Sequence, residues 1–109
     1  MKFGLSHETI AKIQAVFKKY STIHEVIIYG SRAKDNYKNG SDIDLTIVSA
    51  SINFSTIMNI KIALEDLNLP YQIDLSIYSH ISNEYLKEHI DRVGESFYET
   101  ACLQMKQTS

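Results

Sequence analysis

The stretch HEVIIYGSRAKDNYKNGSDIDLTIV, residues 24–48, decides how this chain folds. It begins with a β-branched and aromatic run, residues 24–29, that ends at Gly30, which is the pattern of a buried strand running into a turn. Residues 31–41 are polar and contain Asn, Asp and Gly, so they predict a turn of helix followed by a loop. Residues 42–48 begin with strict polar and apolar alternation, which predicts a second strand.

Further helices and strands are predicted on both sides of this stretch. In chain order they are a helix from Ser6, strands over 24–29 and 42–48, a helix over 54–68, a strand over 71–77, a helix from about Ser82 and a short strand near Phe97. In the third helix we expect Tyr85 and His89 to face inward and Gly94 to take the left-handed C-terminal position. The order of elements predicts an α+β fold, with a small mixed β-sheet and helices packed on it.

Composition limits the class of protein and of partner. The 109 residues fit a single domain over 1–109, whose weakly patterned end, 100–109, is a frayed turn of helix or lacks regular structure. A formal net charge of -2 leaves no broad basic surface for generic binding to nucleic acid or anionic membranes. Cys102 is the one cysteine, so no disulfide forms within the chain, and a reducing, cytoplasmic location is expected.

A candidate phosphate-binding turn lies where the first strand ends. Gly30 has no Cβ, so an anion can approach the backbone N–H groups of the turn closely. Ser31 adds a hydroxyl donor and Arg32 a planar cation, both of which suit phosphate oxygens. Tyr29 and Tyr37 flank the loop and could line a base or ribose pocket, although simple packing is favoured for Tyr29.

Carboxylates gather on the polar faces of two predicted strands. Asp42 and Asp44 share one face of the second strand, and Asp74 projects from the polar face of the third. Like charges packed this closely raise one another's proton affinity, and a divalent cation keeps them ionised near neutral pH. Because the donors are oxygens alone, the expected ion is Mg²⁺ or Mn²⁺ and not zinc.

The turn at Gly30 and the carboxylates of Asp42, Asp44 and Asp74 together resemble the signature of the minimal nucleotidyltransferases of the DNA polymerase beta superfamily. That signature has Gly-Ser, nine residues, Ser-Asp-x-Asp and a later Asp on another strand, and GSRAKDNYKNGSDIDL at 30–45 with QIDLSIY at 72–78 matches it in type and spacing. The resemblance covers residues 24–78 and implies the nucleotidyltransferase fold, whose sheet is like the palm of polymerase beta. One departure is Asp35, where the family commonly has Gly.

The resemblance also implies roles for single residues. Gly30 and Ser31 would hold the β and γ phosphates of ATP, while Asp42 and Asp44 would bind both of two Mg²⁺ ions. Asp74 would complete the site of the catalytic metal and help to deprotonate the acceptor hydroxyl. We therefore predict Asp42, Asp44 and Asp74 as catalytic and metal-binding residues. The predicted nucleotide-binding residues are Gly30, Ser31, Arg32 and Ser41, of which Ser41 taken alone is more typical of a turn.

A partner protein is expected to present the acceptor, because a chain this short has little surface left to enclose one. Minimal nucleotidyltransferases of this kind pair with a small helical HEPN-type ribonuclease toxin, so the resemblance implies an antitoxin that moves AMP from ATP to a tyrosine of that toxin. Two alternatives stay open. One is a non-catalytic antitoxin that blocks its toxin by binding through apolar residues such as Phe97, Leu103 and Met105. The other is a stand-alone transferase that acts on a small molecule such as an aminoglycoside.

Overall fold

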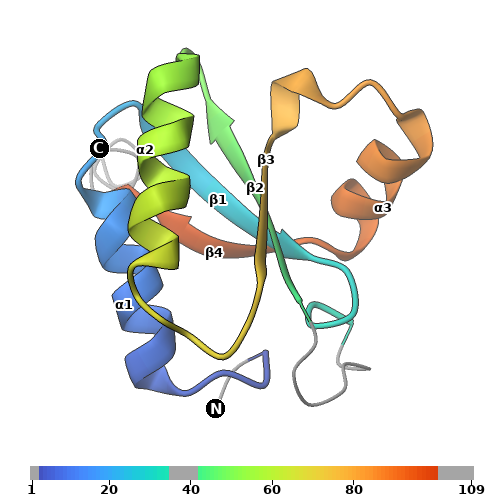
Figure 1. The fold of residues 1–109 in the computed structure, drawn as a ribbon. Helices are drawn as coiled ribbons and strands as arrows, with labels where there is room; N and C mark the ends of the chain where they lie inside the picture. Colours follow the sequence, from blue (N-terminus) through green and yellow to red (C-terminus); the bar gives the residue numbers. More distant parts are fainter. Residues whose placement is uncertain (1–2, 35–41, 101–109) are drawn as a thin grey trace, which may run out of the picture.

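Four strands pair side by side in the order β3-β2-β1-β4 (Figure 1). The structure is a computed structural model, and it describes residues 3–34 and 42–100. The strands are β1 (Ile23–Tyr29), β2 (Ile43–Ser49), β3 (Ile73–Ile77) and β4 (Glu95–Glu99). β1 pairs antiparallel with both β2 and β4, whereas β2 and β3 are parallel. The predicted small mixed sheet is therefore confirmed.

Side-chain caps begin the three helices, α1 (His7–Lys18), α2 (Phe54–Glu65) and α3 (Glu84–Val93). The hydroxyl of Ser6 accepts a hydrogen bond from the Thr9 amide and so caps the helix that the sequence predicts from this residue. The side chains of Asn53 and Asn83 do the same for α2 and α3. A short 3-10 turn, η1 (Tyr78–His80), precedes α3. The described residues include no helix long and apolar enough to cross a membrane.

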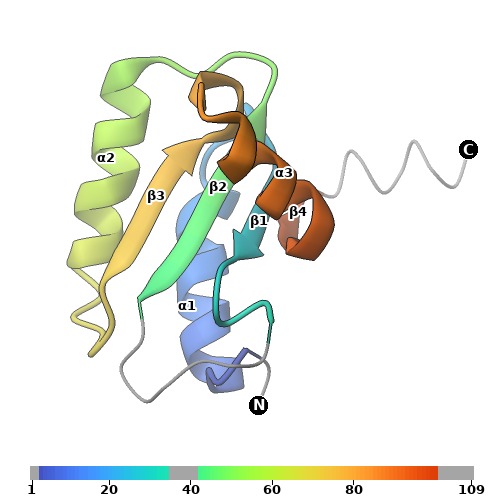
Figure 2. The same ribbon diagram turned by 90° about the vertical axis from the view of Figure 1, so that its right-hand side faces the viewer.

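The two faces of the sheet have different neighbours. α1 and α2 lie together against one face, and α3 lies against the other (Figures 1 and 2). Viewed from the α3 side, in Figure 2, α3 lies over the β1 and β4 side of the sheet. Apolar residues from the alternate positions of β1, β2 and β3 form the core beneath α1 and α2, among them Val26, Ile28, Ile43, Leu45, Ile47, Leu75 and Ile77.

Three expectations about the C-terminal third are wrong. Tyr85 is 85% exposed, so it is not part of the inner face of α3. Gly94 has φ −65° and is not left-handed; it is needed because a Cβ there would collide with Ile27 and with the Ile90 carbonyl. Phe97 is buried against Phe3, so it offers no exposed surface to a partner. Leu103 and Met105 lie outside the described residues.

Candidate active site

Both the backbone conformation and the neighbouring side chains require a glycine at position 30. It directly follows β1, and its φ of +76° lies in the left-handed region that disfavours any residue with a Cβ. A Cβ at this position would also collide with the carboxylate of Asp44. The amide of Lys34 donates to the Gly30 carbonyl at 3.2 Å, which closes a single turn after the strand. The turn at Gly30 therefore lies directly against a predicted catalytic carboxylate.

Sheet pairing brings the predicted carboxylates together. Asp44 of β2 is the register partner of Asp74 in the parallel strand β3, and of Tyr29 in β1. Asp42 precedes Asp44 by two residues. Asp42 and Asp74 are exposed and Asp44 is half-buried. We call Asp42, Asp44 and Asp74 the acidic row.

The negative charges of Asp42 and Asp74 act on the carboxyl group of Asp44. The pKa of Asp44 is raised above its ordinary value of 3.8, first by burial and then by the negative charges of Asp74 and Asp42. The nearby His89 imidazole of α3 acts in the opposite direction and lowers the pKa of Asp44. The row is thus a site where an added cation would relieve repulsion between carboxylates.

The carboxylate oxygens of the acidic row suit a hard divalent cation, but these side chains do not lie close enough together to bind one as they stand. Carboxylate oxygens are the ligands that Mg²⁺ takes in proteins. Among residues 3–34 and 42–100, however, no three His, Cys, Asp or Glu side chains are close enough to hold a metal ion as they stand. The exposed side chains of Asp42 and Asp74 are free of core packing and can adjust around an ion, whereas Asp44 is fixed by the strand pairing on both of its sides.

Further side chains border the acidic row. Tyr29 is 7% exposed and contacts the His89 ring edge-on at 6.3 Å between centroids. Burial raises the pKa of the Tyr29 hydroxyl, and the charges of Asp44 and Asp74 raise it further, against the opposing effect of the nearby Ser76 hydroxyl. Packing, favoured for Tyr29 from the sequence, is what the structure shows.

Ser76 and His89 lie next to the site but are not among the predicted site residues. Ser76 follows Asp74 by two residues, so strand alternation places both on the same face of the sheet. The sequence could therefore have indicated that Ser76 lies near the site. Helical spacing indicates that His89 faces inward, but only the packing of α3 against β1 brings it to the row.

Arg32 contributes to the fold and not to the open surface. It is 2% exposed, and its guanidinium donates to the Phe3 carbonyl at 2.8 Å. The same group lies over the ring of Tyr71, 4.8 Å from the ring centroid. Arg32 thus ties the turn after Gly30 to the N-terminal segment and to the segment before β3. This arrangement does not favour the predicted contact between Arg32 and a nucleotide.

The remaining predicted nucleotide-binding residues are placed only in part. Ser31 is half-buried in the turn after Gly30. Ser41, together with Asp35 and Tyr37 of the loop, lies outside the described residues. The roles of Ser31 and Ser41 stay predictions.

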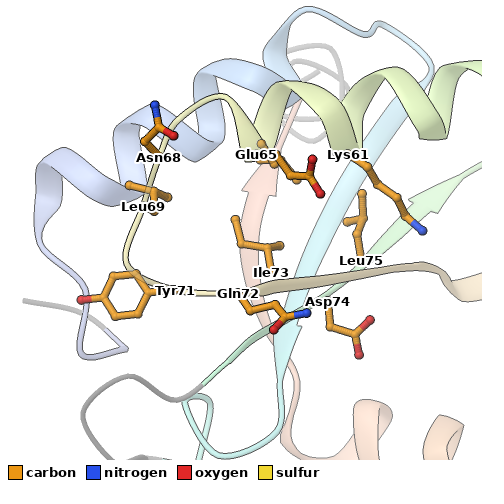
Figure 3. A pocket seen from close by; sticks show the side chains of 10 residues that line it. Lys61, Glu65, Asn68, Leu69, Tyr71, Gln72, Ile73, Asp74 and Leu75 are labelled. Carbon is orange, nitrogen blue, oxygen red and sulfur yellow. The ribbon is translucent and has the colours of Figure 1, made fainter.

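A cavity of about 350 Å³ lies between α2 and β3, and Figure 3 shows its lining. Lys61 and Glu65 lie on the α2 side of β3, whereas the carboxylate of Asp74 points to the other side. The strand therefore separates most of this cavity from the acidic row. The row itself is an open surface, with Asp42 and Asp74 exposed to solvent.

Comparison with known proteins agrees with this arrangement. Residues 11–101 match the family model described as "Polymerase beta, Nucleotidyltransferase". A curated relative, the "Probable protein adenylyltransferase MntA" of Haemophilus influenzae, is 27% identical over 85 residues, which are 77% of this chain and 75% of the relative.

Solved structures share the fold at low sequence identity. A toxin–antitoxin crystal structure with AMP-PNP has a TM-score of 0.66 at 16% identity and covers 95% of this chain and 89% of that one. A structure of a tri-AMPylated HEPN toxin of Shewanella oneidensis in complex with its MNT antitoxin has a TM-score of 0.65 at 14% identity, over 93% of this chain and 78% of that one. The predicted nucleotidyltransferase fold is confirmed.

Proposed function

Because this chain belongs to the polymerase beta nucleotidyltransferase family, we propose that it transfers AMP from ATP to a tyrosine hydroxyl of a HEPN-type toxin and so acts as an antitoxin. The observation that carries the proposal is the contact between the Gly30 turn and Asp44, with Asp74 paired beside it. A phosphate-binding turn and carboxylates meet there on one surface.

Two features support an acceptor on another protein. The acidic row is open to solvent at Asp42 and Asp74, so a hydroxyl on a separate chain can reach it. The relative from Haemophilus influenzae bears the name of a protein adenylyltransferase, and two of the solved structures of the same fold are described as toxin–antitoxin complexes. An enclosed pocket for a small acceptor would favour the aminoglycoside alternative, but the cavity of Figure 3 lies mostly behind β3.

The chemistry assigned to each residue follows from its place. The turn at Gly30 and Ser31 binds the β and γ phosphates through backbone N–H groups and the Ser31 hydroxyl. Asp42 and Asp44 would hold Mg²⁺, with Asp74 completing the ligand set. The bound ion would supply a lower pKa for the acceptor hydroxyl and a positive charge to offset that of the phosphates. Asp74 also helps to take the proton from the hydroxyl. The bond from the tyrosine oxygen to the α phosphorus forms as the bond to pyrophosphate breaks.

The test is transfer of label to the toxin. The purified chain, the product of the neighbouring gene, Mg²⁺ and ATP labelled at the α phosphate are incubated together. We expect label on a toxin tyrosine with the wild type and none with the Asp42→Ala, Asp44→Ala double variant. Asp66→Ala is the matched control, since Asp66 is an exposed acid at the C-terminal cap of α2, outside the acidic row, and should label as the wild type does.

Each outcome discriminates between the hypotheses. Absence of label with the wild type, or equal label with the double variant, would contradict the proposal. If the double variant transfers no label but still protects cells from the toxin, binding alone is sufficient and the non-catalytic alternative is correct.

A further inference from the structure

We propose that Arg32 is a positioning residue for nucleotide binding, whose buried guanidinium fixes the turn after Gly30 so that the N–H groups of the turn point at the β and γ phosphates. The inference rests on the proposed function, since it concerns the phosphate-binding turn assigned there. Arg32 itself does not touch the nucleotide. It acts through the backbone of residues 30–34, which the contacts of its side chain hold in place.

The burial of a cation is the first observation. Arg32 is 2% exposed, and arginine stays charged in proteins. Removal of a charge from water costs free energy unless partners bind the group. An aliphatic side chain would fill the same space without that cost, so packing alone does not explain a guanidinium here. Its planar fork of N–H donors can instead hold separate segments of the chain in fixed directions.

Two segments that are distant in sequence hold this guanidinium. Arg32 Nη1 donates to the Phe3 carbonyl at 2.8 Å, and the guanidinium carbon lies 4.8 Å from the centroid of the Tyr71 ring. Phe3 is itself buried, with its ring centroid 6.3 Å from that of Phe97 in β4. Tyr71 comes two residues before β3, at the start of the segment that leads to Asp74 (Figure 3). The turn after β1 is thereby tied to both edge strands of the sheet.

The turn is short, so its direction depends on such ties. The Lys34 amide donates to the Gly30 carbonyl at 3.2 Å and closes a single turn. One helical turn is not stable by itself in water, because the first turn fixes several residues for one hydrogen bond. Arg32 lies in the middle of this turn, and the left-handed Gly30 at its start lies against Asp44. The contacts of the Arg32 side chain therefore fix how the turn is directed relative to the acidic row.

A direct contact between Arg32 and phosphate is the alternative role. For that contact, the guanidinium would have to leave the Phe3 carbonyl and the Tyr71 ring. The two roles predict opposite effects of a change at Tyr71. If the ring holds Arg32 in place for the turn, its loss weakens nucleotide binding. If the ring keeps Arg32 away from the phosphates, its loss releases the guanidinium, and binding is kept or strengthened.

The test measures nucleotide binding apart from transfer. Binding of AMP-PNP, a non-hydrolysable analogue of ATP, to the full chain is titrated by calorimetry in the presence of Mg²⁺. Tyr71→Leu removes the aromatic ring, Arg32→Lys keeps a cation without the fork, and Arg32→Met removes the charge. A hydrogen bond to a charged group contributes about 10-fold to affinity, so Tyr71→Leu and Arg32→Lys should each weaken binding by about that factor. Arg32→Met should weaken it further.

Two controls separate positioning from a loss of stability. Tyr71→Phe keeps the ring and should bind AMP-PNP as the wild type does. Phe17→Leu removes a buried ring that packs against Tyr98, the register partner of Val26 in the middle of β1. It should lower the melting temperature but leave AMP-PNP affinity unchanged in the folded protein, because Gly30 lies beyond the end of β1.

The transfer assay gives a second measurement. KM for ATP should rise in Tyr71→Leu and Arg32→Lys with little change in KM for the toxin, because the turn contacts only the nucleotide. Thermal melts show whether each variant is folded. Tyr71→Leu and Arg32→Lys test the inference if Arg32→Met fails to fold.

The inference and the proposed function fail in different ways. Unchanged AMP-PNP affinity in Tyr71→Leu and Arg32→Lys, or stronger binding by Tyr71→Leu, would overturn the positioning role. An equal loss of affinity in Phe17→Leu would overturn it too, since lower stability would then explain the effect. Absence of AMP-PNP binding by the wild type would do the same. If the wild type binds AMP-PNP, the variants bind it weakly and no AMP reaches the toxin, the positioning role stands and the proposed function does not.

Discussion

The two faces of the sheet are built from the same strands but serve different ends. On the face under α1 and α2, Leu45 and its neighbours are fully buried among aliphatic and aromatic side chains. On the face toward α3, one residue earlier, Asp44 lies between Tyr29 and Asp74 with its carboxylate half-buried. Adjacent residues of β2 thus belong to a packed core and to an acidic surface.

The difference shows how a small domain separates stability from chemistry. Burial of aliphatic side chains on one face stabilises the fold. This stabilisation offsets the repulsion between the closely spaced carboxylates on the other face. The raised pKa of Asp44 is the sign of that cost, since burial and like charges disfavour its ionised form. Substitutions on the core face should therefore change the free energy of unfolding, whereas substitutions on the acidic face should change AMP transfer.

The largest effect on stability is expected from Leu45→Ala. Leu45 is fully buried in the core, and large-to-small changes at such positions cost about 2–5 kcal/mol of unfolding free energy. Urea unfolding should show this loss. Asp44→Asn, one residue away, should keep or raise the urea midpoint while AMP transfer is lost. Equal destabilisation by both variants would refute the separation of the two faces.

Gly30→Ala should lower both the stability of the fold and the rate of AMP transfer. A left-handed φ costs a residue with a Cβ roughly 1–2 kcal/mol, and the new methyl group would also displace the Asp44 carboxylate. We expect a lower melting temperature together with loss of AMP transfer. Gly4→Ala is the control, because Gly4 has a similar φ of +73° in the N-terminal segment. It should lose stability by a similar amount but keep its transfer activity, and matching activity losses would exclude a special role for Gly30.

The smallest effect is a pH dependence of stability without metal. A carboxyl group whose pKa is raised by folding destabilises the folded state when ionised, so the penalty is complete above the folded pKa and disappears below the ordinary value of 3.8. In EDTA, Asp44→Asn should melt at a higher temperature than the wild type at pH 7. The difference should shrink as pH falls through the folded pKa of Asp44. A difference that grows toward acid pH would show that the pKa shift has the opposite sign.

Much of the site could be predicted because it is local in sequence. The alternation through residues 42–48 predicts Asp42 and Asp44 on one face, and the spacing from Gly30 indicates a turn near them. Arg32 could not be placed in this way. Its cationic side chain suits phosphate in isolation, but the Phe3 carbonyl and the Tyr71 ring, both distant in sequence, bury it. Tyr85 likewise has inward helical spacing, yet it is exposed.

Local sequence patterns specify the strands before and after the Gly30 turn and the shared face of Asp42 and Asp44, because the two-residue period of a strand is a local property. The parallel pairing of β3 with β2, with Asp74 opposite Asp44, and the docking of α3 that brings His89 to Tyr29 become visible only in the folded chain. The reason is that strand order and helix docking depend on contacts between residues far apart in the chain, which a local periodicity does not record.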